Sequence, residues 1–197
     1  MHKIRIALLG AIIGLQASFS IQEIKAQEIY LEEFQWTINI PESYEKVDME
    51  SWAKIQGRGE DMIESTFGEE MINQAKTLFV FKKGKLNYIE SNVQPYDTVV
   101  DGAYRETTQL VNEMLYITIS NQFPDMKVDS TFSTLEVDGQ EFNSFHIQVK
   151  LKEDLSLHMY LFSQLFGNRE LSLNITYLDE NEGQKLLKAW KSSRFGK

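Results

Sequence analysis

The stretch at residues 155–177 constrains the fold of this chain more than any other. Its first arm, residues 155–162, alternates leucine and methionine with histidine, tyrosine and phenylalanine, so it is apolar or aromatic on both faces of a strand. The second arm has one apolar face and one polar face, formed by Leu171, Leu173, Ile175 and Tyr177 and by Ser172, Asn174 and Thr176 respectively. Gly167-Asn168 suits the positive φ angles of a tight turn. The stretch therefore predicts a central β-hairpin in a sheet covered on both faces.

The remaining chain supplies further strands and helices. Alternating apolar residues predict a strand at residues 34–40, a hairpin around residues 83–85 and another hairpin that turns at Asp138-Gly139. Helical spacing predicts a short helix at residues 60–67, after a break at Gly57-Arg58-Gly59, and a long helix at residues 101–122.

A final helix is expected after residue 178. Asp179 should cap its N-terminus, and Glu182 should complete a D-x-x-E capping box. This order of elements predicts one α+β domain over residues 27–197, an antiparallel sheet of hairpins covered by helices on both faces as an α/β/α sandwich.

Residues 1–26 have the composition of a signal peptide. A short basic segment precedes an apolar run at residues 6–15, which is too short to span a membrane because a spanning helix needs about 20 apolar residues. Cleavage is expected after Ala26, with a mature start at Gln27. Ala17 is a rival site, and a buried N-terminal strand or helix is the alternative. The sequence thus predicts an exported protein, periplasmic or secreted, without a membrane span after signal removal.

The composition excludes several classes of function. The formal net charge is −9, and residues 1–26 hold more basic than acidic groups, so the remainder is more acidic still. Such a charge repels nucleic-acid phosphates and anionic membrane surfaces. The chain has no cysteine, which excludes thiol nucleophiles, cysteine-bound zinc and disulfides.

Few residues are candidates for a catalytic or metal-binding site. His146 and His158 fall on neighbouring predicted strands, where a carboxylate such as Asp154 could join them around a metal, but their spacing matches no metal motif and ordinary strand histidines explain them. Glu28, Glu32 and Glu33 are expected in a mobile N-terminal tail. We therefore assign no catalytic, cofactor-binding or metal-binding residue, and we expect no cofactor.

Aromatic side chains could mark a binding groove. Tyrosine is common where one end of a side chain is buried and the other reaches a partner. Core packing is the favoured interpretation, because a sheet covered on both faces needs large residues. The candidates are Tyr88, Tyr96, Tyr104, Tyr160 and Phe162.

Three segments carry a resemblance to a known family. The opening FQWTINIPESY, the turn at Asp138-Gly139 and the closing NITYLDENEGQKLLKAWKSSRF resemble PsbP-like proteins over roughly residues 33–195. Their α/β/α sandwich is shared with a Ran-binding nuclear import factor, and the same layout resembles a group of uncharacterised exported bacterial proteins. The resemblance implies a non-enzymatic accessory or interaction role, and it identifies no functional residue and no photosynthetic role.

The sequence favours an exported binding or accessory protein whose partner is a protein or a small-molecule ligand. The alternative is a hydrolase or metal-dependent enzyme of the cell envelope that uses His158 with nearby carboxylates. A third possibility is a structural protein of the envelope with no discrete ligand.

Overall fold

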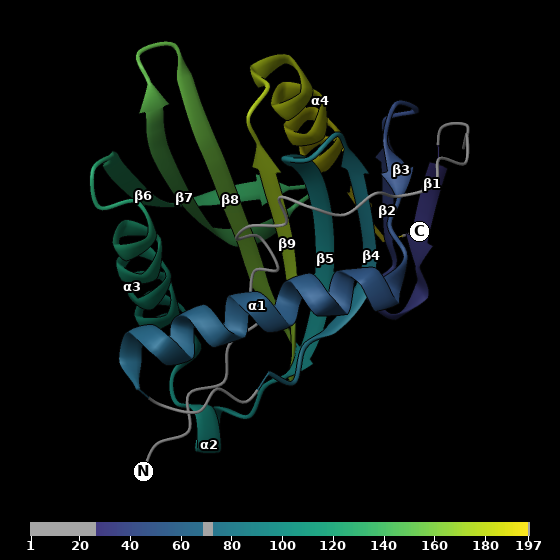
Figure 1. Cartoon of the computed structure of the whole chain (residues 1–197). Coiled ribbons are helices and arrows are strands. Elements are labelled where there is room, and N and C mark those ends of the chain that lie inside the picture. Colours follow the sequence, from purple (N-terminus) through teal and green to yellow (C-terminus); the bar gives the residue numbers. More distant parts are fainter. Residues whose placement is uncertain (1–26, 69–72, 197) are drawn as a thin grey trace.

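The computed structural model describes residues 27–68 and 73–196, and its main feature is a seven-stranded antiparallel sheet (Figure 1). The strand order is β3-β4-β5-β9-β8-β7-β6. The strands are β3 (Glu45–Lys46), β4 (Lys76–Lys83), β5 (Asn87–Pro95), β6 (Lys127–Val137), β7 (Gln140–Lys152), β8 (Leu155–Phe166) and β9 (Arg169–Tyr177). The predicted hairpin is confirmed as β8 and β9, and β9 is the central strand.

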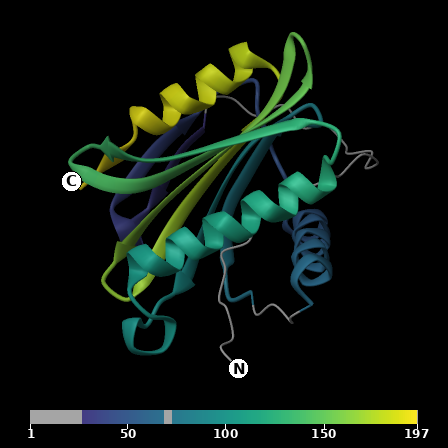
Figure 2. The ribbon, with the colours of Figure 1, turned by 90° about the vertical axis from the view of Figure 1, so that its left-hand side faces the viewer.

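Helices cover both faces of this sheet, as predicted. Figure 2 shows α1 (Met49–Phe67) and α3 (Tyr104–Gln122) on one side and α4 (Glu180–Lys191) on the other. A short helix, α2 (Thr98–Asp101), precedes α3. No helix in the described ranges is long and apolar enough to cross a membrane. The α+β sandwich is therefore confirmed.

A second, three-stranded sheet lies beside α4 and was not predicted. It consists of β1 (Gln27–Leu31), β2 (Trp36–Ile40) and β10 (Arg194–Phe195), and the 3₁₀ turn η1 (Glu32–Phe34) joins β1 to β2. The assignment of Glu28, Glu32 and Glu33 to a mobile tail is therefore wrong. These residues lie in β1 and η1 because β1 pairs along its whole length with β2.

The first helix is longer than predicted. The prediction that the chain breaks at Gly57-Arg58-Gly59 before the helix is wrong, because α1 continues through these residues from Met49 to Phe67. The helix begins where the Asp48 carboxylate accepts a 2.8 Å hydrogen bond from the Ser51 N–H. Buried Trp52 and Ile63, on either side of the glycines, hold it against the sheet. Tertiary packing outweighs the weak helix propensity of glycine here.

The last helix begins as predicted, but its capping box is incomplete. Asp179 Oδ1 accepts a 3.1 Å hydrogen bond from the Glu182 N–H. The N–H of Asp179 donates to Asn87 Oδ1 at 3.0 Å, and the Glu182 carboxylate instead binds Lys83 and Lys185 at 2.9 and 2.6 Å. The strand-end asparagine therefore takes the place of the glutamate in the capping box.

The two faces of β9 differ in chemistry. Its apolar residues pack with α4 and β2 in a core that includes Leu173, Trp36 and Trp190. The opposite face of β9, which faces α3, carries polar residues that are nevertheless buried: Glu170, Ser172, Asn174 and Thr176. This buried polar face positions the candidate site.

Candidate binding cleft

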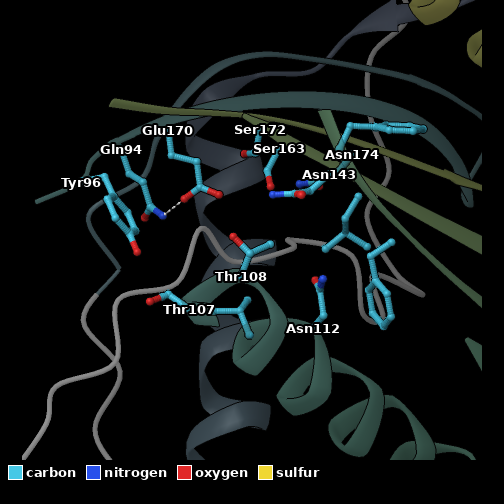
Figure 3. Close-up of a pocket in the computed structure, with 14 residues that line it drawn as sticks. Gln94, Tyr96, Thr107, Thr108, Asn112, Asn143, Ser163, Glu170, Ser172 and Asn174 are labelled. Carbon is cyan, nitrogen blue, oxygen red and sulfur yellow. Dashed lines mark hydrogen bonds between the residues drawn. The ribbon is translucent and has the colours of Figure 1, made fainter. Parts of the chain in front are cut away.

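A small polar cavity lies between α3 and the sheet (Figure 3). Strand residues form its floor, and Thr108 and Asn112 of α3 face them from the helix. The cavity has a volume of about 40 Å³, enough for water molecules but not for an organic ligand. The polar floor residues are Gln94, Asn143, Ser163, Glu170, Ser172 and Asn174.

Glu170 closes one end of this cavity. Its Oε1 accepts a 3.2 Å hydrogen bond from the Tyr104 hydroxyl, and its Oε2 accepts one from the Gln94 amide. Burial raises the pKa of the Glu170 carboxyl, while hydrogen bonds from Gln94, Tyr104 and Ser163 oppose that rise. Burial and the neighbouring Glu170 also raise the pKa of Tyr104. Glu170 is thus a buried carboxyl that its neighbours hold in one orientation.

A second buried carboxyl, Glu90, lies further along the polar face. Its Oε1 accepts hydrogen bonds from the amides of Asn92 and Asn174 at 2.8 and 2.9 Å. Asn92 in turn accepts a 2.8 Å hydrogen bond from the Thr77 hydroxyl. This network links β4, β5 and β9 inside the protein, so it contributes to the structure of the sheet.

The cavity adjoins an open hollow between α3 and β6. This hollow has a volume of about 370 Å³, and it shares Asn112 and Phe145 with the cavity. Its remaining lining residues are Arg105, Gln109, Glu113, Tyr116, Ile117, Ser130 and Phe132. The side chains of Ile117 and Phe132 are each 43% exposed although both are large and apolar. The hollow therefore presents apolar surface to solvent.

A further hollow of about 300 Å³ lies between the polar cavity and the open hollow. It shares Arg105 and Phe132 with the open hollow, and Asn143 and Ser163 with the cavity. We call the two open hollows together the α3–β6 cleft. Its lining combines apolar side chains, amides and hydroxyls with one guanidinium, Arg105, and two carboxylates, Glu113 and Glu141.

The two candidate histidines meet on the other face of the sheet. His146 Nε2 and His158 Nδ1 share a hydrogen bond of 3.0 Å, and Tyr160 stacks on His146 with ring centroids 4.0 Å apart. The carboxylate near them belongs to Glu180, 3.9 Å from His158 Nε2, while Asp154 lies in the turn between β7 and β8. In residues 27–68 and 73–196 no three His, Asp or Glu side chains are grouped to hold a metal ion.

Burial lowers the pKa of both imidazoles. That of His146 falls to about 4, with a further contribution from the neighbouring His158, and Glu180 opposes the effect at both residues. Both rings are therefore neutral at pH 7. The stack of two imidazoles and two tyrosine rings, Tyr160 and Tyr177, packs this end of β7, β8 and β9.

The aromatic residues that the sequence offered as candidates fall into two groups, one in the core and one at the site. Tyr88 and Phe162 are buried, as core packing predicts, and Tyr160 is half-buried beside the histidines. Tyr96 lines the polar cavity and half-buried Tyr104 binds Glu170, so these two tyrosines belong to the site. Of the two expected cleavage residues, Ala26 lies outside the described residues and Gln27 begins β1.

Most residues of the cleft were not singled out from the sequence. Glu170 follows the Gly167-Asn168 turn, and charged residues are common beside turns. Phe132 lies in a predicted strand, where aromatic residues are also common. The usable signal was the polar face of β9, because a central strand with three small polar residues on one face requires a polar partner layer. Thr108 and Asn112 of α3 provide that layer.

No family model matches the chain, and no curated protein matches it. Solved structures do resemble it. Cyanobacterial PsbP from Synechocystis is 9% identical, with a TM-score of 0.53, over 92% of this chain and 99% of that one. A Bacteroides thetaiotaomicron protein is 9% identical, with a TM-score of 0.45, over 88% of this chain and 50% of that one. The Saccharomyces cerevisiae Ran-binding protein Mog1p is 11% identical, with a TM-score of 0.42, over 87% of this chain and 95% of that one. The likeness to cyanobacterial PsbP concerns the fold alone, and the chain has the predicted PsbP-like α+β fold.

Proposed function

We propose that this protein is an exported, non-enzymatic binding or accessory protein whose partner docks in the α3–β6 cleft. The single observation that carries the proposal is the exposure of Phe132 and Ile117 beside a preformed hollow of about 370 Å³. Concave surfaces that combine apolar side chains with a few fixed polar groups are typical of binding sites. The cleft has both components.

The lining chemistry favours recognition over catalysis. The described lining residues of the cleft offer amides, hydroxyls, carboxylates and one guanidinium, all groups that form hydrogen bonds with a partner. Glu170, in the adjoining cavity, is held by Gln94 and Tyr104, so its oxygens are already engaged.

Export is the second element of the proposal. Residues 1–26 would act as the signal peptide, and the protein would function in the periplasm or outside the cell. Cleavage after Ala26 would leave β1 whole, since β1 begins at Gln27, whereas cleavage after Ala17 would leave nine further residues before it. The mass of the processed chain, recovered from a periplasmic fraction or the medium, tests this element.

Affinity capture tests the binding role. The full chain, with a C-terminal tag and its own N-terminal segment, is expressed in the organism of origin, and proteins retained from envelope extract are identified by mass spectrometry. We expect a reproducible partner whose recovery falls about tenfold with Phe132→Ala, because hot-spot aromatics contribute at least 1–2 kcal/mol. Leu110→Ala is the matched control, since Leu110 is 58% exposed on α3 but does not line the cleft. Equal recovery from all three proteins would refute the cleft as the site.

The alternative function is hydrolysis or metal-dependent catalysis at the histidine pair. The observation that favours it is the 3.0 Å approach of His146 to His158, with Glu180 nearby. Turnover in a broad hydrolase screen that disappears with His158→Ala, but persists with Phe132→Ala, would support this alternative over the binding role.

A further inference from the structure

We propose that β6 accepts an extended, positively charged segment of the partner protein as an eighth strand of the sheet. The inference rests on the proposed binding function and specifies its mode and its partner chemistry. It follows from the backbone of β6, from the side chains beside it and from the charges around the cleft.

The backbone of β6 has an open side. β6 ends the strand order, and in the described part of the chain only β7 pairs with it, over eleven residues from Lys127 to Val137. The opposite end of the sheet is β3, which is only two residues long. Short edge strands are protected against pairing with other chains, and long ones are open to it. β6 is therefore the edge that can accept a strand.

The hairpin turn shows which backbone groups are open. Asp138 and Gly139 form a two-residue turn with φ angles of 49° and 77°, so the closing pair Val137 and Gln140 is hydrogen-bonded. Hydrogen-bonded and non-bonded pairs alternate along an antiparallel ladder. The N–H and C=O groups that point away from β7 thus belong to alternate residues: Val128, Ser130, Phe132, Thr134 and Glu136. The Val128 carbonyl accepts a 3.4 Å hydrogen bond from the Tyr116 hydroxyl of α3, so the stretch offered to an added strand is residues 130–136.

The same residues face α3 with their side chains. Phe132 pairs with Phe145, which packs in the core beneath α3, and Ser130 and Phe132 both line the α3–β6 cleft. A strand added to β6 would direct every second side chain to the same face of the sheet, beside Phe132 and Ile117. Backbone pairing and the apolar cleft would therefore bind one segment together, as in other cases of strand addition.

The charges around the cleft favour a basic segment. Arg105 is outnumbered by Glu113 and Glu141 in the cleft lining, and Glu136 adds an exposed carboxylate on β6. The one lysine of β6, Lys127, is ion-paired with Asp129 at 2.6 Å. A second copy of this chain would bring the same acidic surface and a formal charge of −9, so like charges would oppose self-pairing. A partner segment with Lys or Arg complements the cleft.

A displayed library of random ten-residue peptides tests the proposal on the full chain. We expect selected peptides to alternate apolar residues with Lys or Arg and to bind more weakly in high salt. The decisive variant is Ser130→Pro, which removes an outward N–H without breaking the ladder to β7, and Ser130→Ala is its matched control. We expect Ser130→Pro to weaken binding about tenfold or more and Ser130→Ala to change it less than about threefold. N-methylation of alternate peptide residues should have the effect of the proline.

Thermal melting checks that the proline variant folds, and Thr134→Pro, which removes another outward N–H, replaces it if it does not. Failure to enrich any peptide, or equal binding to Ser130→Pro and wild type, would overturn strand addition. A dimer in sedimentation that Ser130→Pro dissociates would also overturn it, because the occupant would then be a second copy. Peptides that lose affinity with Phe132→Ala but not with Ser130→Pro would refute strand addition and leave the binding cleft intact. A partner captured with the wild-type chain but released by neither variant would refute the cleft as well.

Discussion

Replacement of Gly183 by alanine should destabilise this protein, although glycine to alanine in a helix normally does the reverse. In an exposed helix interior the change stabilises by about 1 kcal/mol. Gly183 lies buried in α4, and a Cβ placed there would fall within 2.5 Å of the Tyr177 ring atoms Cγ, Cδ1 and Cδ2. Ordinary contact needs at least 3.4 Å, so the ring and the helix would have to separate by about 1 Å.

The Tyr177 ring has little room to move. It is 1% exposed, it belongs to the central strand β9, and it stacks against His158 with centroids 4.8 Å apart. Overpacking of this kind costs about 1–3 kcal/mol. Because the overlap is severe we take the upper value, and after the helix-propensity gain of about 1 kcal/mol a net loss of about 2 kcal/mol remains. For a chain of this size that loss lowers the melting temperature by about 4–8 °C.

Gly57→Ala is the matched control. Gly57 also lies inside a helix, α1, but a Cβ there would meet nothing within 4 Å. This variant should gain up to about 1 kcal/mol and melt about 2–4 °C above the wild type. Thermal melting by circular dichroism, with urea unfolding for the free energies, measures both variants. If Gly183→Ala melted at or above the wild-type temperature, the close packing of α4 on the Tyr177 ring would be refuted.

Three further predictions concern buried groups. Leu157→Asp and Leu173→Asp should each abolish the cooperative melt, since each places an unpaired charge among buried apolar residues on one of the two faces; a soluble, cooperatively melting variant would contradict this. Because burial lowers the pKa of His146 to about 4 and lowers that of His158 as well, these two residues bind protons in the unfolded chain that they do not bind in the folded chain, and their contribution to stability should fall as pH drops from about 6.5 to about 4. Urea unfolding at pH 7 and at pH 4.5 measures this loss of stability, and His146→Gln should reduce it. If the variant lost as much stability between the two pH values as the wild type, the lowered pKa of His146 beside His158 would be contradicted. Burial raises the pKa of Glu170, so at this residue the folded chain holds a proton that the unfolded chain releases, and the contribution of Glu170 to stability should fall as pH rises above about 4.3; the difference between wild type and Glu170→Gln, measured in the same unfolding series at pH 4 to 8, should show this component.

Local signals predicted the larger sheet and failed on non-local features. The turns Asp138-Gly139 and Gly167-Asn168 specify their hairpins through residues that adopt positive φ, here Asp138, Gly139 and Gly167, so a short window is sufficient. β1 depends on pairing with β2 and was missed because five residues with two glutamates carry no strand signal of their own. The start of α1 was missed for the same reason, since buried Trp52 and Ile63 stabilise a helix that its glycines weaken.

The site was harder to predict than the fold because no segment contains it. Its cavity gathers side chains from β5, β7, β8, β9 and α3, and the carboxyl that closes it, Glu170, is 76 residues from its partner Gln94. Sequence spacing identifies sites whose residues share one helix or one loop. Polar residues scattered over five elements become a site only when the sheet register brings them to one face.

The two faces of the seven-stranded sheet pack differently, and this difference explains why the cleft lies beside α3. On the α4 face, Trp36, Phe142 and Trp190 pack ring against ring and leave the core closed. On the α3 face, the polar row of β9 cannot pack as densely, because each buried hydroxyl or amide must find a hydrogen-bond partner rather than only a matching shape. Ser172 Oγ and the Asn112 amide nitrogen have no partner within the described residues, and both lie at the cavity. A face that is held together by directional bonds leaves space between helix and sheet, and this space lies beside the open hollow at β6, the last strand of the sheet.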